Sequence, residues 1–116
     1  MVRNLLAIDQ ERGWIGIGGE VAAGERLLFV RRDPESAQAD FRGVLEGLKS
    51  RLPGAPRGGL YFSCVARGPG LFGEGGAEAR MIREILGPVP VAGFFGGGEI
   101  SNARLYAYTG VLALFF

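Results

Sequence analysis

Ser63, Cys64 and Arg67 lie at the end of an apolar segment, where their side chains could do chemistry. A guanidinium binds carboxylates or phosphates through paired hydrogen bonds, and a nearby cation activates a thiol by lowering its pKa. The chain contains no histidine, so neither a Cys-His pair nor a Ser-His-Asp triad can form within it. We therefore expect Cys64 to pack in the core or to line a pocket, and we expect no enzymatic activity. A cysteine-dependent enzyme is the minor alternative.

Metal and cofactor sites are not expected. One cysteine and no histidine leave the chain without the usual ligands of zinc. The letters of Gly68–Gly73 match the G-x-G-x-x-G dinucleotide fingerprint. However, the next helix is expected to begin three or more residues after Gly73, and no acidic residue ends the following strand. We therefore interpret this segment as a tight or mobile loop.

The same loop could hold an anion. Arg67 precedes it and a helix N-terminus follows it, and backbone N–H groups at helix N-termini and in glycine-rich loops bind anions. We predict that Arg67 and Gly68 contact a small anionic ligand. The alternative is that Arg67 forms a structural ion pair with Glu74 or Glu99. The residues alone leave both readings open.

A second segment joins two aromatic residues, a glycine turn and one carboxylate. Aromatic walls with one charged group are typical of ligand pockets. We predict one pocket formed by Ser63, Cys64, Arg67, Gly68, Phe94, Phe95, Gly98 and Glu99. In that pocket Glu99 would accept a hydrogen bond from a ligand amine or orient Arg67, so an amino acid would suit it. The alternative is a core strand that ends in a turn with a solvated Glu99.

Short apolar segments between turn residues predict the strands that position these side chains. Asp33 as N-cap and Pro34 at the first helical position predict a helix that ends near Ser50, and Gly87 with the proline after it ends a second helix over 77–86. The predicted order is β-β-β-α-β-α-β-β, an α+β fold with a mostly antiparallel or mixed sheet and two helices on one face. The expected strands cover residues 2–9, 14–17, 26–32, 59–66, 89–94 and 104–116, and a further short one starts at Glu99.

Composition limits the class of protein. The 116 residues fit one domain over 1–116, and the formal net charge of +1 comes without the basic stripe that nucleic-acid binding needs. No segment approaches the roughly 20 apolar residues of a membrane span, so we expect a cytoplasmic protein. All basic residues except Lys49 are arginine, a weak hint of thermophily.

The predicted last strand, 104–116, is apolar on both sides. A strand with two apolar faces is normally covered on both, and two helices can cover only one face of the sheet. We therefore expect a second subunit or a further domain on the other face. Self-association as a homo-oligomer is the favoured interpretation, because large exposed apolar patches mark interfaces.

Two ordered motifs resemble the C-terminal domain of the FIST family (F-box and intracellular signal transduction proteins). They are FSCVARG at 62–68 and PVAGFFGGGEI at 90–100, followed by an apolar strand that contains Thr109. The resemblance implies a sensory domain that accompanies signalling outputs or F-box segments and binds small ligands such as amino acids. The N-terminal FIST half of the family is not found here, so we expect the chain to stand alone or beside a partner that supplies it.

Two functions follow as expectations. The first is a sensory domain that binds a small anionic metabolite, such as an amino acid, at the predicted pocket. The second is a non-enzymatic structural or interaction domain that acts through its apolar sheet face, as an oligomer or with a partner protein. A stable oligomer without a pocket would favour the second.

Overall fold

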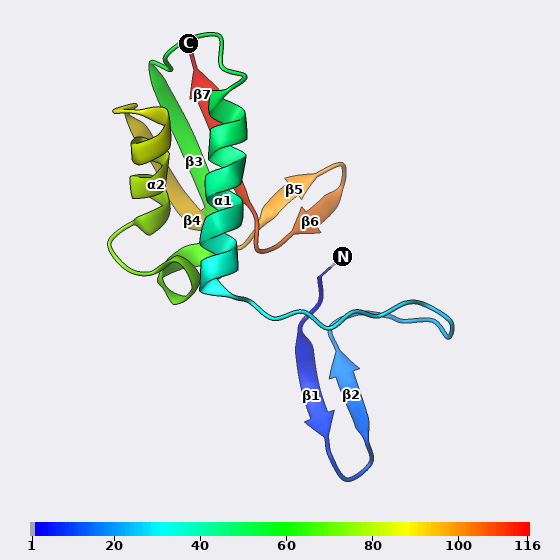
Figure 1. Ribbon diagram of the computed structural model, residues 1–116. Coiled ribbons are helices and arrows are strands. Elements are labelled where there is room, and N and C mark those ends of the chain that lie inside the picture. Colours follow the sequence, from blue (N-terminus) through cyan, green and yellow to red (C-terminus); the bar gives the residue numbers. More distant parts are fainter. Residues whose placement is uncertain (1) are drawn as a thin grey trace. The chain divides into compact units, whose positions relative to one another are not determined.

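The computed structural model describes residues 2–116, and the chain divides into two compact units, with the boundary between Val30 and Arg31. In the first unit, β1 (Leu5–Asp9) pairs antiparallel with β2 (Trp14–Ile17), as Figure 1 shows. Gly13 takes a φ of +69° in the connecting turn, a conformation that glycine adopts at little cost. The predicted strand over 14–17 is thus confirmed with the same bounds, and the predicted strand over 2–9 is confirmed over the narrower range Leu5–Asp9.

The predicted strand over residues 26–32 is wrong. The chain from Gly18 to Asp33 contains no strand or helix, although residues 27–30 are all apolar. Leu28 is 84% exposed and Phe29 is 69% exposed. A β-type sequence forms a strand only when a neighbouring strand accepts its backbone hydrogen bonds and its side chains pack, and this segment has neither within its own unit.

The second unit is a mixed three-stranded sheet with two helices on one face (Figure 1), which confirms the predicted α+β class. The strand order is β4-β3-β7, and β3 runs parallel to β4 but antiparallel to β7. Helix α2 connects the two parallel strands, as such a crossover requires. The bounds are α1 Pro34–Lys49, β3 Gly58–Cys64, α2 Ala77–Leu86, β4 Val91–Gly96 and β7 Gly110–Phe115.

Helix α1 begins and ends where the sequence predicts. The Asp33 carboxylate accepts the Ser36 N–H at 2.9 Å, and Pro34 occupies the first turn. Ser50 forms the C-cap. Phe41 and Leu45 are the buried residues of this helix, whereas Val44 is 57% exposed.

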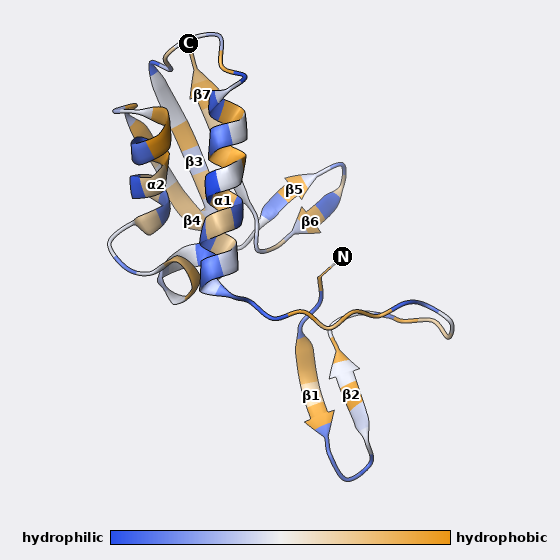
Figure 2. Ribbon diagram, in the orientation of Figure 1, coloured by the Kyte–Doolittle hydropathy of each residue, from blue (hydrophilic) through white to orange (hydrophobic). Residues whose placement is uncertain are grey.

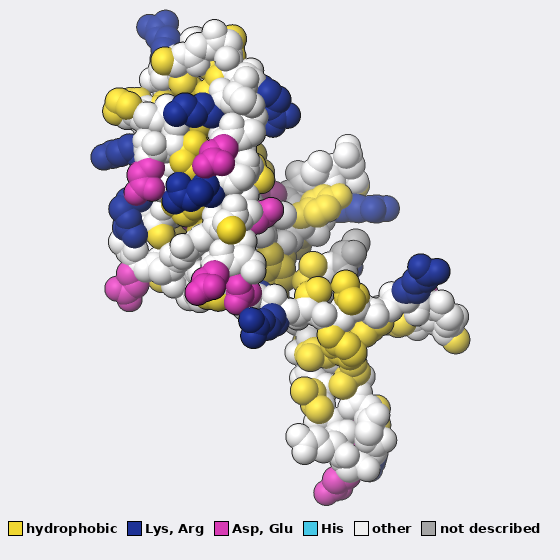
Figure 3. Space-filling view, in the orientation of Figure 1, with side chains coloured by type: hydrophobic (Ala, Val, Ile, Leu, Met, Phe, Trp, Pro, Cys, Tyr) yellow, Lys and Arg dark blue, Asp and Glu magenta, His cyan; other side chains and the backbone are white. Residues whose placement is uncertain are grey.

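The core lies between the two helices and the sheet. Figure 2 shows apolar colour along the strands and polar colour on the outward side of the helices, and Figure 3 shows charged side chains spread over that outer surface. The loop between β3 and α2 adds Leu71 and Phe72 to the apolar core. The buried core residues are Phe41, Leu45, Leu71, Phe72, Met81, Ile82, Ile85 and Val89.

The predicted final strand over 104–116 is two strands. β6 (Arg104–Tyr106) pairs with β5 (Glu99–Ser101), whereas β7 pairs with β3. The break falls at Tyr108, which has a φ of +64°. Hydropathy alone does not show this break, because residues 105–116 contain no charged side chain.

The other face of the sheet has no helix over it in the second unit. We call this surface the bare face. The alternating residues of β3, β4 and β7 form it, and the rings of Phe62 and Phe94 meet edge to face there at 5.1 Å. Its members are Leu60, Phe62, Ala92, Phe94, Val111, Ala113 and Phe115.

Candidate functional site

The glycine-rich loop between β3 and α2 is tightly wound rather than extended. It makes a 3-10 turn, η1 (Val65–Arg67), and then one π-helical turn, η2 (Gly68–Phe72). Single π turns occur often at functional sites. Gly73, Gly75 and Gly76 follow with φ of +89°, +69° and +69°. These backbone conformations favour glycine, so the glycines allow the chain to turn sharply into α2.

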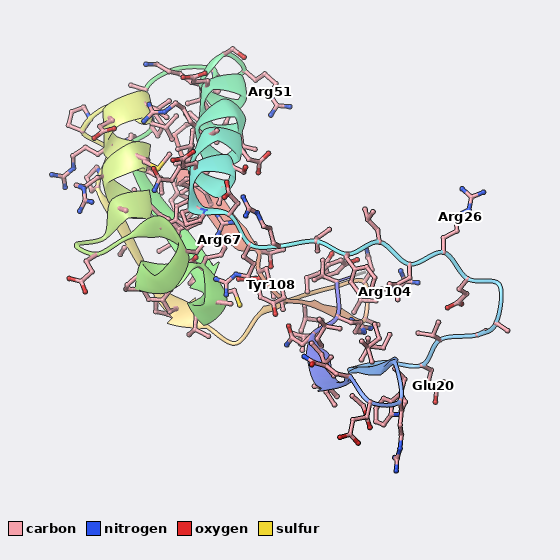
Figure 4. All side chains as sticks on the ribbon, turned by 60° about the horizontal axis from the view of Figure 1, so that its bottom comes forward. Glu20, Arg26, Arg51, Arg67, Arg104 and Tyr108 are labelled. Atoms are coloured by element: carbon pink, nitrogen blue, oxygen red, sulfur yellow. The ribbon has the colours of Figure 1, made fainter. Side chains whose placement is uncertain are left out.

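Arg67 forms a buried ion pair with Glu78 in the first turn of α2. Its Nη2 and Nε lie 2.8 Å and 2.9 Å from the same oxygen, Oε1. The side chains of Arg67 and Glu78 are only 15% and 6% exposed. The guanidinium also stacks on Phe72 at 4.7 Å and Phe41 at 5.4 Å, and Figure 4 shows Arg67 beside the helices. The cation is therefore enclosed by a carboxylate and two rings.

Two residues of β3 complete the cluster around the Glu78 carboxylate. The Tyr61 hydroxyl donates to Oε1 at 2.6 Å, and the Ser63 hydroxyl donates to Oε2 at 3.0 Å. Burial, followed by the hydrogen bond and charge of Glu78, raises the pKa of Tyr61 to about 12. Buried charges are tolerated when they are paired and hydrogen-bonded, and these donors meet that condition for Glu78.

Sequence reasoning missed Glu78 and Tyr61. Glu78 is 5% exposed and shares the buried stripe of α2 with Met81, Ile82 and Ile85. The spacings of three, four and seven residues put all four on one helix face. An acidic residue on an apolar helix stripe is the signal that could have pointed to a buried cation, because an unpaired buried carboxylate is costly.

A cavity of about 310 Å³ lies next to this cluster. It opens beside the carboxyl ends of the parallel strands β3 and β4, where ligands bind in open α/β sheets. Polar groups come from Tyr61, Ser63 and Glu78, and apolar walls come from the loop and β4. The lining residues are Tyr61, Ser63, Gly68, Pro69, Phe72, Gly73, Gly76, Ala77, Glu78, Ala79 and the five residues Val91, Ala92, Gly93, Phe94 and Phe95.

The N-terminus of α2 borders the cavity without a side-chain cap. Its N-cap is Gly76, which has no side chain to accept a hydrogen bond, and the first helical bond runs from the Arg80 N–H to the Gly76 carbonyl. The N–H groups of the first turn have no intrahelical acceptor. They add a positive partial charge to one wall of the cavity.

The structure brings together half of the sequence-predicted site. Ser63, Gly68, Phe94 and Phe95 line the cavity, whereas Cys64, Arg67, Gly98 and Glu99 are not among its lining residues. Cys64, the last residue of β3, is 2% exposed, and its N–H donates to the Thr109 carbonyl at 2.9 Å.

The two charged residues expected to share the pocket have separate partners. Glu78 pairs with Arg67, in place of the Glu74 or Glu99 that we considered from the sequence. Glu99 begins β5 and accepts a hydrogen bond from the Thr109 hydroxyl. The register of β3 explains why Arg67 pairs with Glu78. Tyr61 and Ser63 face α2, so the carboxylate nearest to Arg67 belongs to that helix.

No helix within residues 2–116 is both long and apolar enough to cross a membrane. The fold and the polar cluster define an α+β domain with a ligand-sized cavity at the carboxyl ends of its parallel strands. The chain belongs to the FIST C domain family, whose model matches residues 1–102. This match confirms the resemblance of the two motifs to the C-terminal FIST domain. The family is one of sensory domains of signal-transduction proteins.

The chain is also similar to several curated proteins. An uncharacterised protein of Mycobacterium tuberculosis is 40% identical over 99% of this chain and 31% of its own length. A second, of Mycobacterium bovis, has the same identity and coverage. Human F-box only protein 22 is 30% identical over 89% of this chain and 26% of its own length. The chain thus spans less than a third of these relatives, and no solved structure matches it significantly.

Proposed function

We propose that this chain is a non-enzymatic sensory domain that binds a small anionic metabolite, such as an amino acid, in the cavity beside α2. The observation that supports this proposal is the uncapped N-terminus of α2 at the wall of a 310 Å³ cavity. Helix N-termini bind carboxylates and phosphates through their free N–H groups. The volume is at the small end of the range for ligand pockets, which suits a metabolite of amino-acid size.

Each part of the ligand has a partner in this proposal. The ligand carboxylate accepts hydrogen bonds from the first-turn N–H groups of α2, the role that sequence reasoning gave to Arg67. The Ser63 hydroxyl donates to Glu78 and keeps lone pairs with which to accept from an ammonium group. Phe72 and Phe95 close the apolar side. Arg67 acts indirectly, because its ion pair with Glu78 holds the start of α2 against β3.

Isothermal titration against the twenty amino acids and a set of small carboxylates tests the proposal. At least one should bind with a dissociation constant below millimolar. Ala79 lines the cavity in the first turn of α2, so Ala79→Asp should weaken that binding tenfold or more by repelling the carboxylate. Ala79→Asn is the matched neutral control. Absence of any millimolar binder, or equal affinities of the two variants, would contradict the proposed site.

A second candidate is a structural or interaction domain that acts through the bare face. The observation that favours it is the exposure of that face, where Phe94 is 67% and Phe115 is 54% exposed. The partner would be a second copy of the chain or a protein that supplies the N-terminal FIST half. Light scattering separates the candidates, because a stable oligomer that binds none of the titrated ligands supports this one alone.

Catalysis by Cys64 is the minor alternative. The thiol is buried and lies outside the cavity lining, whereas reactive cysteines are partly exposed. Under our proposal, Cys64→Ala binds the ligand with unchanged affinity, and thiol reagents modify the native protein far more slowly than the unfolded chain. Rapid labelling of the native thiol would support the enzymatic reading.

A further inference from the structure

We propose that the cavity beside α2 captures the carboxyl-terminal residues of an extended peptide, whose backbone pairs with the free edge of β4. The inference rests on the proposed function, since it keeps the ligand carboxylate at the N-terminus of α2. It deepens that function by naming the ligand class, of which a free amino acid is the shortest member.

Strand β4 is an open edge of the three-stranded sheet. Within residues 31–116 it pairs only with β3, and Figure 1 shows it at the margin of that sheet. The Gly59 N–H donates to the Pro90 carbonyl at 2.9 Å. Alternate residues after Pro90 therefore bond to β3, and those between them, starting with Val91, point their backbone groups outward. Such groups can pair with an added extended segment, and β4 contains no charge or proline that would oppose it.

The cavity of about 310 Å³ follows this edge. Five consecutive residues, Val91–Phe95, line it. Side chains along a strand alternate between the two faces of a sheet, so a cavity over one face would be lined by every second residue. Residues 92–95 are also exposed. No residue of β7, the other edge strand, lines the cavity, so β4 is the edge that a ligand in the cavity reaches.

The lined edge has the length of a short peptide. Five strand residues span four steps of about 3.3 Å each, or roughly 13 Å, which an added strand of about four residues covers. The cavity volume would hold only the last of these residues, because it is at the small end of the range for ligand pockets. The side chain of that residue would contact Phe72 and Phe95, and the preceding residues would lie along β4.

The positive end of the cavity sets the direction of the peptide. Phe95 pairs with Ser63, whose hydroxyl donates to Glu78 in the first turn of α2 at 3.0 Å. The uncapped N-terminus of α2 therefore lies at the Phe95 end of the edge. Its free N–H groups favour a terminal carboxylate there. The charge of Glu78 does not oppose this carboxylate, because Arg67 pairs with Glu78 at 2.8 Å. The peptide would thus run parallel to β4.

A peptide C-terminus is the occupant that uses both the edge and the positive end. A second copy that paired through its own β4 would bring no carboxylate, because the chain continues beyond Gly96. The apolar segment 27–30 of this chain is also internal and has no terminal carboxylate. Either of these would leave the positive end of the cavity unfilled.

Isothermal titration of the 116-residue chain with N-acetylated tetrapeptides tests the inference. The peptides share three alanines, followed by each of the twenty amino acids with a free carboxylate. At least one should bind ten times more tightly than the N-acetyl derivative of its last amino acid, because only the tetrapeptide can pair with β4. Its C-terminal amide and its N-methylated form should each bind at least tenfold more weakly, because the first lacks the carboxylate and the second lacks backbone donors.

Disulfide trapping locates the bound peptide. Cys64 is the only cysteine of the chain and is 2% exposed, so an introduced surface cysteine reacts in its place. The tightest tetrapeptide, with cysteine as its first residue, should cross-link to Ala92→Cys on β4 at least ten times faster than to Val111→Cys on β7 or Val44→Cys on α1. Both control positions are exposed, at 46% and 57%. Circular dichroism checks folding, and Phe94→Cys replaces Ala92→Cys if that chain does not fold.

Three results would overturn the inference. They are tetrapeptides that bind no more tightly than their last amino acid, an amide that binds as tightly as the acid, and equal rates of cross-linking on β4 and β7. The first or third result, with free amino acids still bound, would leave the proposed function standing. The second would remove the N-terminus of α2 as the carboxylate site and so contradict both proposals.

Discussion

Arg67 and Glu78 form the ion pair that joins the end of β3 to the start of α2, with Nη2 and Oε1 2.8 Å apart. The pair is nearly sealed from water, and the rings of Phe41 and Phe72 cover the guanidinium. The same carboxylate receives Tyr61 and Ser63. One acidic side chain therefore fixes the geometry of strand, loop and helix around the cavity.

Glu78→Gln should destabilise the domain by about 3 kcal/mol, because it leaves the Arg67 charge buried without a counter-charge. Urea unfolding followed by circular dichroism measures the loss. Glu74→Gln is the control, because Glu74 is exposed and outside the cluster. A cost below about 1 kcal/mol would show that water or a rearranged side chain compensates the cation.

Tyr61→Phe removes the hydroxyl that donates to Glu78 and should cost about 1.5–3 kcal/mol, as for other hydrogen bonds to charged groups. Its effect depends on pH. The pKa of Tyr61 is raised from 10.0 to about 12, so its stabilising contribution is fully present below pH 10 and is lost as the pH rises toward 12. The native chain should lose stability over that window. A Tyr61→Phe chain with the same alkaline loss would contradict this assignment.

Asp33 should make the stability of α1 sensitive to acid. Hydrogen bonds from Ser36 hold the pKa of Asp33 below its ordinary value. The contribution of a carboxylate with a lowered pKa is present above the ordinary pKa of 3.8 and is lost as the pH falls through the folded-state value.

The variants Asp33→Ala and Asp33→Asn separate the cap from the charge. Asp33→Ala should lower the melting temperature near neutral pH, whereas Asp33→Asn should largely retain it because asparagine also caps helices. Both should reduce the acid dependence. Equal melting temperatures for the two variants would show that the cap contributes little.

Gly93→Ala should be among the most damaging small substitutions in the chain. A Cβ at Gly93 would overlap the carbonyl of Tyr61, its paired residue on β3, and the cost should be about 3 kcal/mol or more from overpacking. The control is Gly43→Ala in α1, where nothing lies within 4 Å. That change should stabilise by about 0.5–1 kcal/mol. Thermal unfolding of both chains compares them directly, and a tolerated Gly93→Ala would show that the two strands can separate.

The sequence by itself determined the local elements whose signals lie within a few residues. Asp33 with Pro34 set the start of α1, and Gly87 set the end of α2. The sequence also showed that the last strand is apolar on both sides, and from this it predicted that one face of the sheet has no helix over it. The motifs at 62–68 and 90–100 were sufficient to indicate the family.

Only the tertiary structure decided which charges meet and which strands pair. Arg67 lies eleven residues from Glu78 and on a different element, so their contact depends on the crossover that lays α2 over β3. Residues 27–30 have a strand-type sequence but belong to no strand, and Tyr108 divides what hydropathy shows as one strand. Local propensity fixes the conformation that a segment prefers, whereas pairing and ion contacts depend on residues distant along the chain that only packing brings together.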